Sequence, residues 1–401
     1  MELVAGYKTT VVGVIPKQWD VQLLKNSLLE NPDYGINAPA VPYSDRLPAY
    51  LRITDITEDG QLSLEKPVSV SHPNASEYFL IAGDIVLART GASVGKSYLY
   101  KPHDGRLVFA GFLIRVRPDP TRLLPSFLSA YLSTEKYWKW VRLMSQRSGQ
   151  PGINSQEYGQ LPIPVPSVHE QIAIVTVLSD LDALLNSLDQ LIAKKRNLKQ
   201  AAMQQLLTGK TRLPGFSGEW EMRRLGEIAE CLDNFRVPLN EAQREKMQGD
   251  YPYCGANGIL GFVNNYVIDD DIILMAEDGG YFDEYQTRPI AYRMSGKCWV
   301  NNHAHILKAK VGTDQTFLFY SLVNKNIQSF LASGTRAKLN KSEMNKIALI
   351  CPAKLCEQTA IASILADIDA EIATIEARRD KTAQIKQGMM QELLTGRTRL
   401  V

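Results

Sequence analysis

The chain has 401 residues, of which 45% are hydrophobic and 22% charged, and these values predict a folded protein with two or three domains. No apolar run approaches the roughly 18 residues that a membrane span needs, and the N-terminal residues lack the pattern of a signal peptide. The formal net charge of +2 excludes a globally basic surface, so any nucleic-acid interface must be local.

Residues 1–165 form the first predicted module, with short strands, a few helices and many Gly, Asn and Pro turns. This mixture is typical of an α+β domain. Its landmarks are Trp19, a strand at Gly83–Leu87, a strand-like run at Leu107–Val116, a helical pattern at Pro125–Met144 and a proline-marked exit at Leu161–Val165.

A glycine-rich stretch at Gly91–Ser97 resembles a phosphate-binding P-loop but is one residue short of that motif. The next residues, Tyr98–Tyr100, predict a strand, whereas a P-loop needs a helix there. The better interpretation is a turn that presents side chains to a nucleic-acid backbone or groove. The candidates are Arg89, Thr90, Ser93 and Lys96.

A small polar loop at Ser145–Asn154 follows the helical pattern of the first module. Arginine suits phosphate neutralisation, and Asn, Gln and Ser suit base edges. The candidate DNA contacts in this loop are Gln146, Arg147, Ser148, Gln150 and Asn154.

Residues 166–213 predict a long helix. Its apolar positions recur at spacings of 4 and 3, as in the seam of a coiled coil, and Gly209 offers a left-handed cap at the C-terminal end. From Glu170 to Leu207 such a helix would be about 57 Å long. The apolar seam consists of Ile174, Leu178, Leu181, Leu185, Leu188 and Ile192.

Residues 214–355 form the second predicted module, which shares the framework of the first. Trp220 corresponds to Trp19, Asp270–Leu274 to the first module's strand, and a polar loop again follows a helical pattern. Different loops on a shared framework indicate two different recognition surfaces. The candidate contacts in the loop are Thr335, Arg336, Lys338 and Asn340.

The five cysteines all lie in the second half of the chain. Their number is odd and they form no Cys-x-x-Cys pair, which favours reduced thiols and a cytoplasmic location.

Two groups in the second module invite a catalytic or metal interpretation. His303 and His305 would share one face of a strand, but no third ligand is evident, so we expect no metal site. Glu277 and Asp278 could suggest a nuclease, but no well-placed lysine partner is evident, and solvated turn residues are the better interpretation.

Residues 356–401 repeat the long helix. Glu357–Leu400 aligns without a gap to Glu170–Leu213, with 20 of the 44 positions identical, and both copies end in LLTG[KR]TRL. Matching apolar seams predict that the two helices pair with each other as an antiparallel coiled coil. The alternative is two separate amphipathic helices, each packed on its own module.

The pattern closely resembles the specificity subunit of type I restriction-modification systems. The resemblance covers nearly the whole chain and depends on the duplicated helices, Tyr7–Thr10, Ile15–Trp19 and the Pro162–Pro164 exit. Tyr251–Ile259, which contains the candidate contact Asn257, and Ala276–Gly280 look like a common target-recognition variant.

The resemblance implies two α+β target-recognition domains separated by the paired helices, each reading one half of a split site in double-stranded DNA. It also implies partners: two modification subunits that methylate adenine with S-adenosylmethionine, and restriction subunits that use ATP, with Mg²⁺ expected there too. This chain would bind no cofactor or metal and have no catalytic residues. One alternative is a self-sufficient DNA nuclease or methyltransferase with an unrecognised active site, and another is a coiled-coil scaffold that does not bind DNA.

Overall fold

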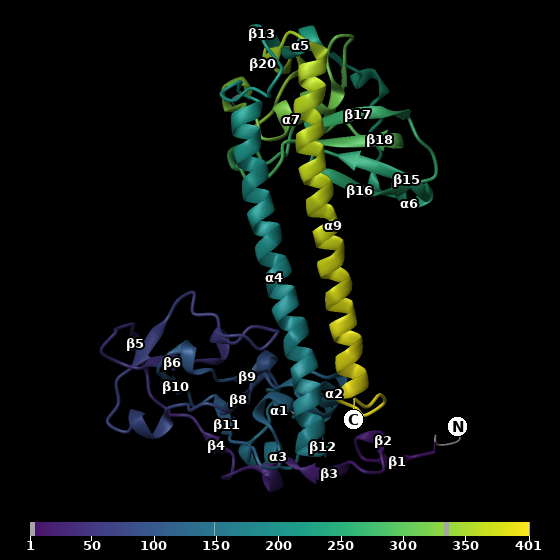
Figure 1. Cartoon of the computed structure of the whole chain (residues 1–401). Coiled ribbons are helices and arrows are strands. Elements are labelled where there is room, and N and C mark those ends of the chain that lie inside the picture. The colour runs from purple at the N-terminus through teal and green to yellow at the C-terminus, as the bar shows by residue number, and fades with distance from the viewer. Residues whose placement is uncertain (1–4, 148, 333–336, 401) are drawn as a thin grey trace. The chain divides into compact units, whose positions relative to one another are not determined.

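The computed structural model describes residues 5–147, 149–332 and 337–400. The chain divides into two compact units (Figure 1): unit 1 is Met1–Ser187 with Arg378–Val401, and unit 2 is Leu188–Ala377. Each unit therefore contains one module and one half of each long helix. The sequence-based boundaries at 165, 213 and 355 instead gave the helices segments of their own, and those boundaries stay a prediction.

Unit 1 contains two four-stranded sheets, with strand orders β10-β6-β7-β5 and β4-β11-β8-β9. Two further pairs, β1-β2 and β3-β12, are antiparallel. The strands are β1 (Tyr7–Thr10), β2 (Gly13–Pro16), β3 (Asp20–Leu23), β4 (Asp33–Tyr34), β5 (Ala40–Pro42), β6 (Ala49–Leu51), β7 (Val68–Val70), β8 (Ile85–Ala88), β9 (Ser97–Leu99), β10 (Leu107–Phe109), β11 (Leu113–Val116) and β12 (Pro162–Val165). The helices are α1 (Pro125–Tyr131), α2 (Glu135–Met144), α3 (Ser155–Gly159), the first half of α4 (Val168–Leu206) and the second half of α9 (Leu355–Leu393).

Unit 2 is built on one six-stranded sheet of order β14-β19-β17-β18-β15-β16, and the antiparallel pair β13-β20 closes the module. The strands are β13 (Trp220–Arg224), β14 (Ala229–Cys231), β15 (Gln248–Gly255), β16 (Gly258–Val263), β17 (Ile268–Ala276), β18 (Ala291–Val300), β19 (Ala304–Ala309) and β20 (Ala348–Pro352). The helices are α5 (Leu225–Ile228), α6 (Glu241–Lys246), α7 (Gln315–Val323), α8 (Lys341–Met344), the second half of α4 and the first half of α9 (Leu355–Leu393).

The predicted strand-like run Leu107–Val116 is wrong as a single strand. It splits into β10, which pairs with β6 in one sheet, and β11, which pairs with β8 in the other. The second module has a similar break, because the turn at Asn301–His303 separates β18 from β19. The hydrophobic pattern does not show where the chain passes from one sheet to the other, because the residues of both β10 and β11 are buried.

The halves of α4 and α9 run antiparallel within each unit. In unit 2, Lys199 pairs with Asp369 at 2.6 Å and Arg196 with Glu376 at 2.6 Å. In unit 1, Lys386 pairs with Asp182. The predicted seam residues Ile174, Leu178, Leu188 and Ile192 are at most 5% exposed. The antiparallel pairing is therefore as predicted, while the coiled-coil geometry stays a prediction.

Each module's core also receives residues from both long helices. In unit 1, Trp19 and Phe127 share a cluster with Ile174 of α4 and Leu394, which follows α9. In unit 2, Leu206 of α4 and Leu365 of α9 join Phe317. Both helices stop as predicted, because Gly209 and Gly396 take left-handed conformations with φ of +67° and +70°.

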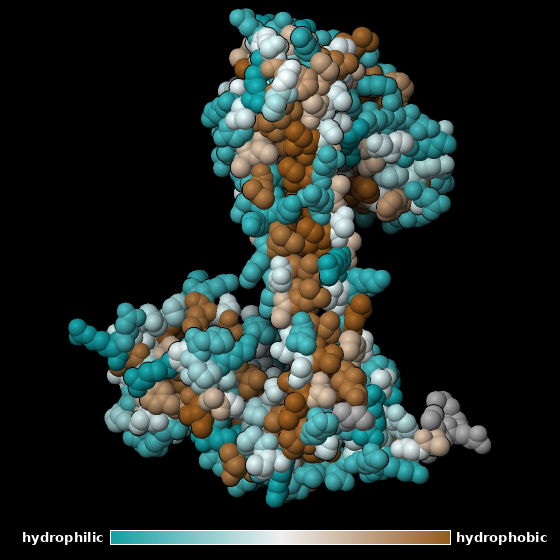
Figure 2. Space-filling view, in the orientation of Figure 1, coloured by the Kyte–Doolittle hydropathy of each residue, from teal (hydrophilic) through white to brown (hydrophobic). Residues whose placement is uncertain are grey.

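Within the described residues, α4 is the single helix whose length and hydropathy reach those of a membrane span, with a mean hydropathy of 1.3 over 18 residues. The seam residues that raise this value, such as Ile174 and Leu178, are buried in the protein core. Other apolar residues of both long helices are exposed, and Figure 2 shows apolar surface along them. The large ones are Ile172, Leu191, Leu198, Leu355, Ile364 and Ile385.

Candidate nucleic-acid interface

A three-way backbone junction in the first module brings its glycine-rich turn and its polar loop together. Strand β8 ends at Ala88, and the next residue, Arg89, donates its N–H to the Phe112 carbonyl at 3.1 Å. The Arg89 carbonyl accepts from the Ile153 N–H at 2.9 Å. A bridge between Thr90 and Gly152 extends the contact.

The second module contains the same junction. Strand β17 ends at Ala276, the Glu277 N–H donates to the His303 carbonyl at 2.9 Å, and the Glu277 carbonyl accepts from the Leu339 N–H at 2.7 Å. A bridge between Asp278 and Lys338 takes the place of the bridge in the first module. The backbone is thus equivalent, but the residue that follows the central strand is Arg in one module and Glu in the other.

Each junction continues into a short helix that starts after an asparagine. Asn154 caps α3, and its Oδ1 accepts from the Glu157 N–H at 2.9 Å. Asn340 stands at the same place before α8, but its side chain makes no capping hydrogen bond. The amide of Asn340 is therefore not used for capping, unlike that of Asn154.

In the first module, five of the predicted contacts line one pocket of about 200 Å³: Arg89, Thr90, Arg147, Gln150 and Asn154. The Arg89 guanidinium lies over the Tyr34 ring, 4.7 Å from its centroid. Arg147 forms an ion pair with Glu157. Two segments that are about 60 positions apart by number therefore form one polar surface, as tertiary contacts between a turn and a loop allow.

Other predicted contacts of the first module are not part of this pocket. Lys96 pairs with Glu58 at 2.5 Å, and only 15% of its side chain is exposed. Ser93 and Gln146 do not line the pocket, and Ser148 lies outside the described residues. The strand β9 follows the glycine-rich turn at Ser97, as predicted, so this turn lacks the helix of a P-loop.

In the second module, the predicted contacts lie around Glu277–Gly280. Asn257 donates from Nδ2 to the Gly279 carbonyl at 2.9 Å, and Lys338 pairs with Glu277 at 2.9 Å. Asn340 is exposed two residues later. Thr335 and Arg336 lie outside the described residues.

The interpretation of Glu277 as a solvated turn residue is wrong. Its side chain is 11% exposed and has the lysine partner that the sequence did not reveal, Lys338, together with Arg236. Burial raises the pKa of the Glu277 carboxyl, but hydrogen bonds from Lys338 and Arg236 outweigh it and hold the pKa below its usual value. Lys338 is 61 positions away by number, so only the fold makes the partnership visible.

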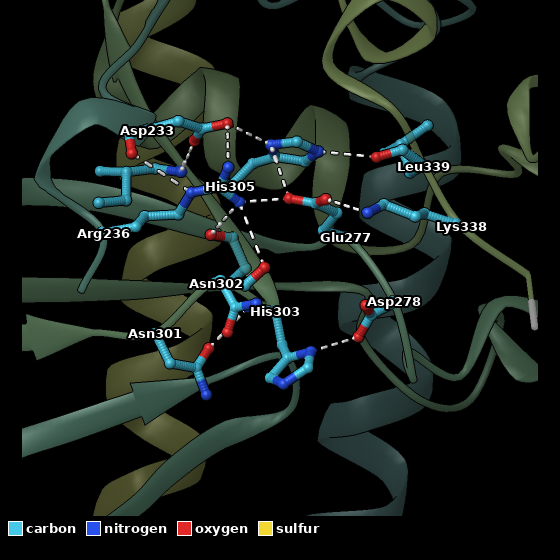
Figure 3. Close-up of polar contacts among 12 residues, drawn as sticks. Asp233, Arg236, Glu277, Asp278, Asn301, Asn302, His303, His305, Lys338 and Leu339 are labelled. Carbon is cyan, nitrogen blue, oxygen red and sulfur yellow. Dashed lines mark hydrogen bonds and ion pairs between the residues drawn. The ribbon is translucent and has the colours of Figure 1, made fainter. Parts of the chain in front are cut away.

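Sequence reasoning also missed a buried cation behind the loop of the second module (Figure 3). The ring of His305 is 1% exposed, its Nδ1 lies 2.7 Å from Asp233 Oδ2, and its Nε2 donates to the Leu339 carbonyl at 2.8 Å. Burial lowers the pKa of His305, but hydrogen bonds to Asp233, Cys231 and Leu339 outweigh it and raise the pKa to about 9. The protonated ring thereby ties the polar loop to the sheet.

His303 and His305 do not act as a pair, contrary to the expectation that they share one strand face. His303 precedes β19, and its Nδ1 contacts Asp278 at 2.6 Å, whereas His305 points to Asp233 (Figure 3). Among the described residues, Cys231, Asp233 and His305 bring possible metal ligands within 4.8 Å of one another. Arg236 bonds to both Asp233 and Glu277 there, so a guanidinium already neutralises these carboxylates.

Comparison with known proteins gives the same family for both halves of the chain. The family described as "Type I restriction modification DNA specificity domain" matches residues 24–197 and again 217–387. The chain is 37% identical over 153 residues to a putative type I restriction enzyme specificity subunit from Haemophilus influenzae, an alignment that covers 38% of each protein. It is 25% identical to the putative MjaX specificity subunit of Methanocaldococcus jannaschii, over 98% of this chain and 97% of that one.

The fold is also that of solved structures. A type I restriction-modification S subunit from M. genitalium matches with a TM-score of 0.63 and 16% identity, over 98% of each chain. A chain from a study of complex assembly and conformational transition in a type I system matches with a TM-score of 0.55 and 15% identity, over 96% of this chain and 99% of that one.

Proposed function

This chain belongs to the type I restriction-modification DNA specificity family, and we propose that it is the subunit that selects the DNA sequence for such an enzyme. In this proposal each module reads one half of a bipartite site in double-stranded DNA. The alternative of a self-sufficient nuclease or methyltransferase has no support from these comparisons.

The observation that carries the proposal is the pair of equivalent junctions with different side chains. Arg89, Thr90 and Gly152 occupy the positions that Glu277, Asp278 and Lys338 occupy in the other module. A fixed backbone with exchanged side chains offers two different patterns of donors and acceptors, and such patterns are what distinguishes base pairs in the major groove.

The chain would act without chemistry of its own. Glu277 is held by Arg236 and Lys338, and His305 by the Leu339 carbonyl, which suits a binding surface better than an acid–base site. S-adenosylmethionine would be bound by two modification subunits, and ATP and Mg²⁺ by restriction subunits. We place the assembly in the cytoplasm, where cellular DNA is accessible to it.

The exposed apolar residues of α4 and α9 suit the docking of modification subunits. Ile172, Leu198 and Ile385 are 46–51% exposed, although they lie on helices whose other faces are buried. Apolar side chains at such positions mark interaction surfaces, and two equivalent helices offer two equivalent sites.

Methylation mapping of host DNA with and without this gene tests the proposal, because it reports both half-sites and the spacer. Residues 214–355 should then be replaced by the second module of another family member. One half-site should change and the other remain, because the modules share a framework but not their loops. Change in both half-sites would contradict independent reading.

The absence of catalysis needs a separate test. The purified chain without partners should neither cleave DNA with divalent metal nor methylate it with S-adenosylmethionine. Either activity, retained through a further purification step, would overturn the non-catalytic part of the proposal.

A further inference from the structure

A second polar pocket in unit 2 lies beside the junction, and its lining includes none of the DNA contacts that were predicted from the sequence. Its volume is about 500 Å³, and it lies between α6, the β15–β16 hairpin and the turn Asn301–His303. Tyr253 and Leu260 supply apolar surface, and Asn240, Gln243, Arg244 and Asn301 supply polar groups.

Arg244 is a cation without an anionic partner among the described residues. Its guanidinium lies over the Tyr253 ring at 5.6 Å from the centroid. Its Nε is buried from solvent and has no hydrogen-bond partner. A buried donor without a partner is costly, so a ligand whose binding shifts the guanidinium and supplies an acceptor would recover that cost.

The amide groups around Arg244 present donors rather than acceptors. Oδ1 of Asn240 accepts from the Gln243 N–H at 2.9 Å, and Oε1 of Gln243 accepts from the Asn240 N–H at 2.9 Å. Oδ1 of Asn301 accepts from the His303 N–H at 2.8 Å. Each carboxamide oxygen is thus engaged by the backbone, and the three NH₂ groups donate to no described residue.

The lining of the pocket fixes the chemistry of its ligand. No Asp or Glu belongs to the lining among the described residues, whereas one guanidinium and the carboxamides of Asn240, Gln243, Asn301 and Asn302 do. A site of this composition suits a group that is rich in hydrogen-bond acceptors and carries negative charge or partial charge. In DNA, that group is a backbone phosphate or the O6 and N7 edge of guanine.

We propose that Arg244 and the amides of Asn240, Gln243 and Asn301 form a second DNA-binding site of this module, which receives an acceptor-rich group of the half-site. The inference depends on the proposed function. It places a DNA contact on α6 and the 301–303 turn, on residues other than the predicted loop contact Lys338.

The test uses the complete chain assembled with its modification subunits and a duplex that contains the site found by methylation mapping. Arg244→Gln removes the charge without breaking an ion pair. Gln243→Glu keeps the oxygen that accepts from Asn240 and replaces the amide donor with a negative charge. Both variants should weaken binding by about tenfold, as the loss of a charged hydrogen bond predicts.

Arg244→Lys separates the two sources of the acceptor group. If the ligand is a phosphate, lysine keeps most of the affinity, and Arg244→Gln lowers the slope of log affinity against log salt by about one. If the ligand is guanine, Arg244→Lys and Arg244→Gln both relax the methylated sequence at one position of one half-site. Either pattern supports the site.

The matched control is Arg288→Gln, since Arg288 also stacks on a tyrosine but pairs with Glu284. The inference is overturned if Arg244→Gln and Gln243→Glu both bind and methylate like the unmodified complex. If the unmodified complex itself shows no sequence-specific binding, the proposed function fails, and the site fails with it.

Discussion

Arg399 forms a bidentate ion pair with Glu170, in which Nε and Nη2 donate to the two carboxylate oxygens at 2.8 and 2.9 Å. Trp19 donates to the same carboxylate at 3.0 Å. In unit 2, Arg212 and Trp220 make the equivalent contacts with Glu357. The last arginine of each LLTG[KR]TRL motif therefore pairs with the Glu near the start of the other long helix. This reciprocal contact gives a structural reason for the repeat.

Glu170→Gln should destabilise unit 1, because Glu170 is 1% exposed. The substitution leaves Arg399 without an anion and places the glutamine NH₂ group against the donors of Arg399 and Trp19. We expect a loss of about 1–3 kcal/mol in the free energy of unfolding. Denaturant titration measures the loss, and amide exchange assigns it to unit 1. Glu371→Gln, which removes an exposed partner of Lys195, is the control and should change little. Equal effects of the two variants would contradict the structural role of Glu170.

The stability of unit 2 should fall as the pH rises. The pKa of His305 is about 9 in the folded protein, above its ordinary value of 6.5, so folding favours the protonated ring. The stabilisation is complete below about pH 6.5 and is lost as the pH rises through 9, by about 3 kcal/mol. Denaturant titrations between pH 6 and 10 measure it. His305→Gln should flatten this part of the profile, and an unchanged slope in the variant would assign the pH dependence to other groups.

Lys338→Ala and Arg147→Ala should weaken DNA binding by the assembled enzyme. If the contacts are to phosphates, each variant should reduce the salt slope by about one charge. Both cations are paired in the free protein, with Glu277 and Glu157, so DNA must replace a carboxylate at each. Affinity measured over a range of salt concentrations tests the prediction, with Arg288→Ala as the control. Unchanged affinity and slope in both variants would show that the two loops do not touch DNA.

Lengthening both long helices by one heptad should add a few base pairs to the spacer between the half-sites. The insertion preserves the apolar seam and adds about 10 Å of helix. Lengthening one helix alone should instead destabilise the pair, because its register would no longer match. Methylation mapping of the double insertion is the measurement, and an active enzyme with an unchanged spacer would show that the helices do not set the distance.

The sequence alone determined the features that depend on local pattern and internal repetition. The spacing of Ile174, Leu178 and Leu188 predicted a long helix with a buried seam, and Gly209 predicted its end, because helix periodicity and left-handed caps are local properties. The duplicated long helices predicted two equivalent modules, and the pattern of short strands and turns predicted the α+β class. The resemblance identified the family.

Only the tertiary structure decided which polar groups meet. Lys338 reaches Glu277, and His305 reaches both Asp233 and the Leu339 carbonyl, through contacts between segments that are 34–72 positions apart. The pocket around Arg244 likewise depends on amide oxygens that the backbone engages, which residue types do not reveal. Burial and ion pairing determine whether a charged side chain is available to a ligand, and both are properties of the fold.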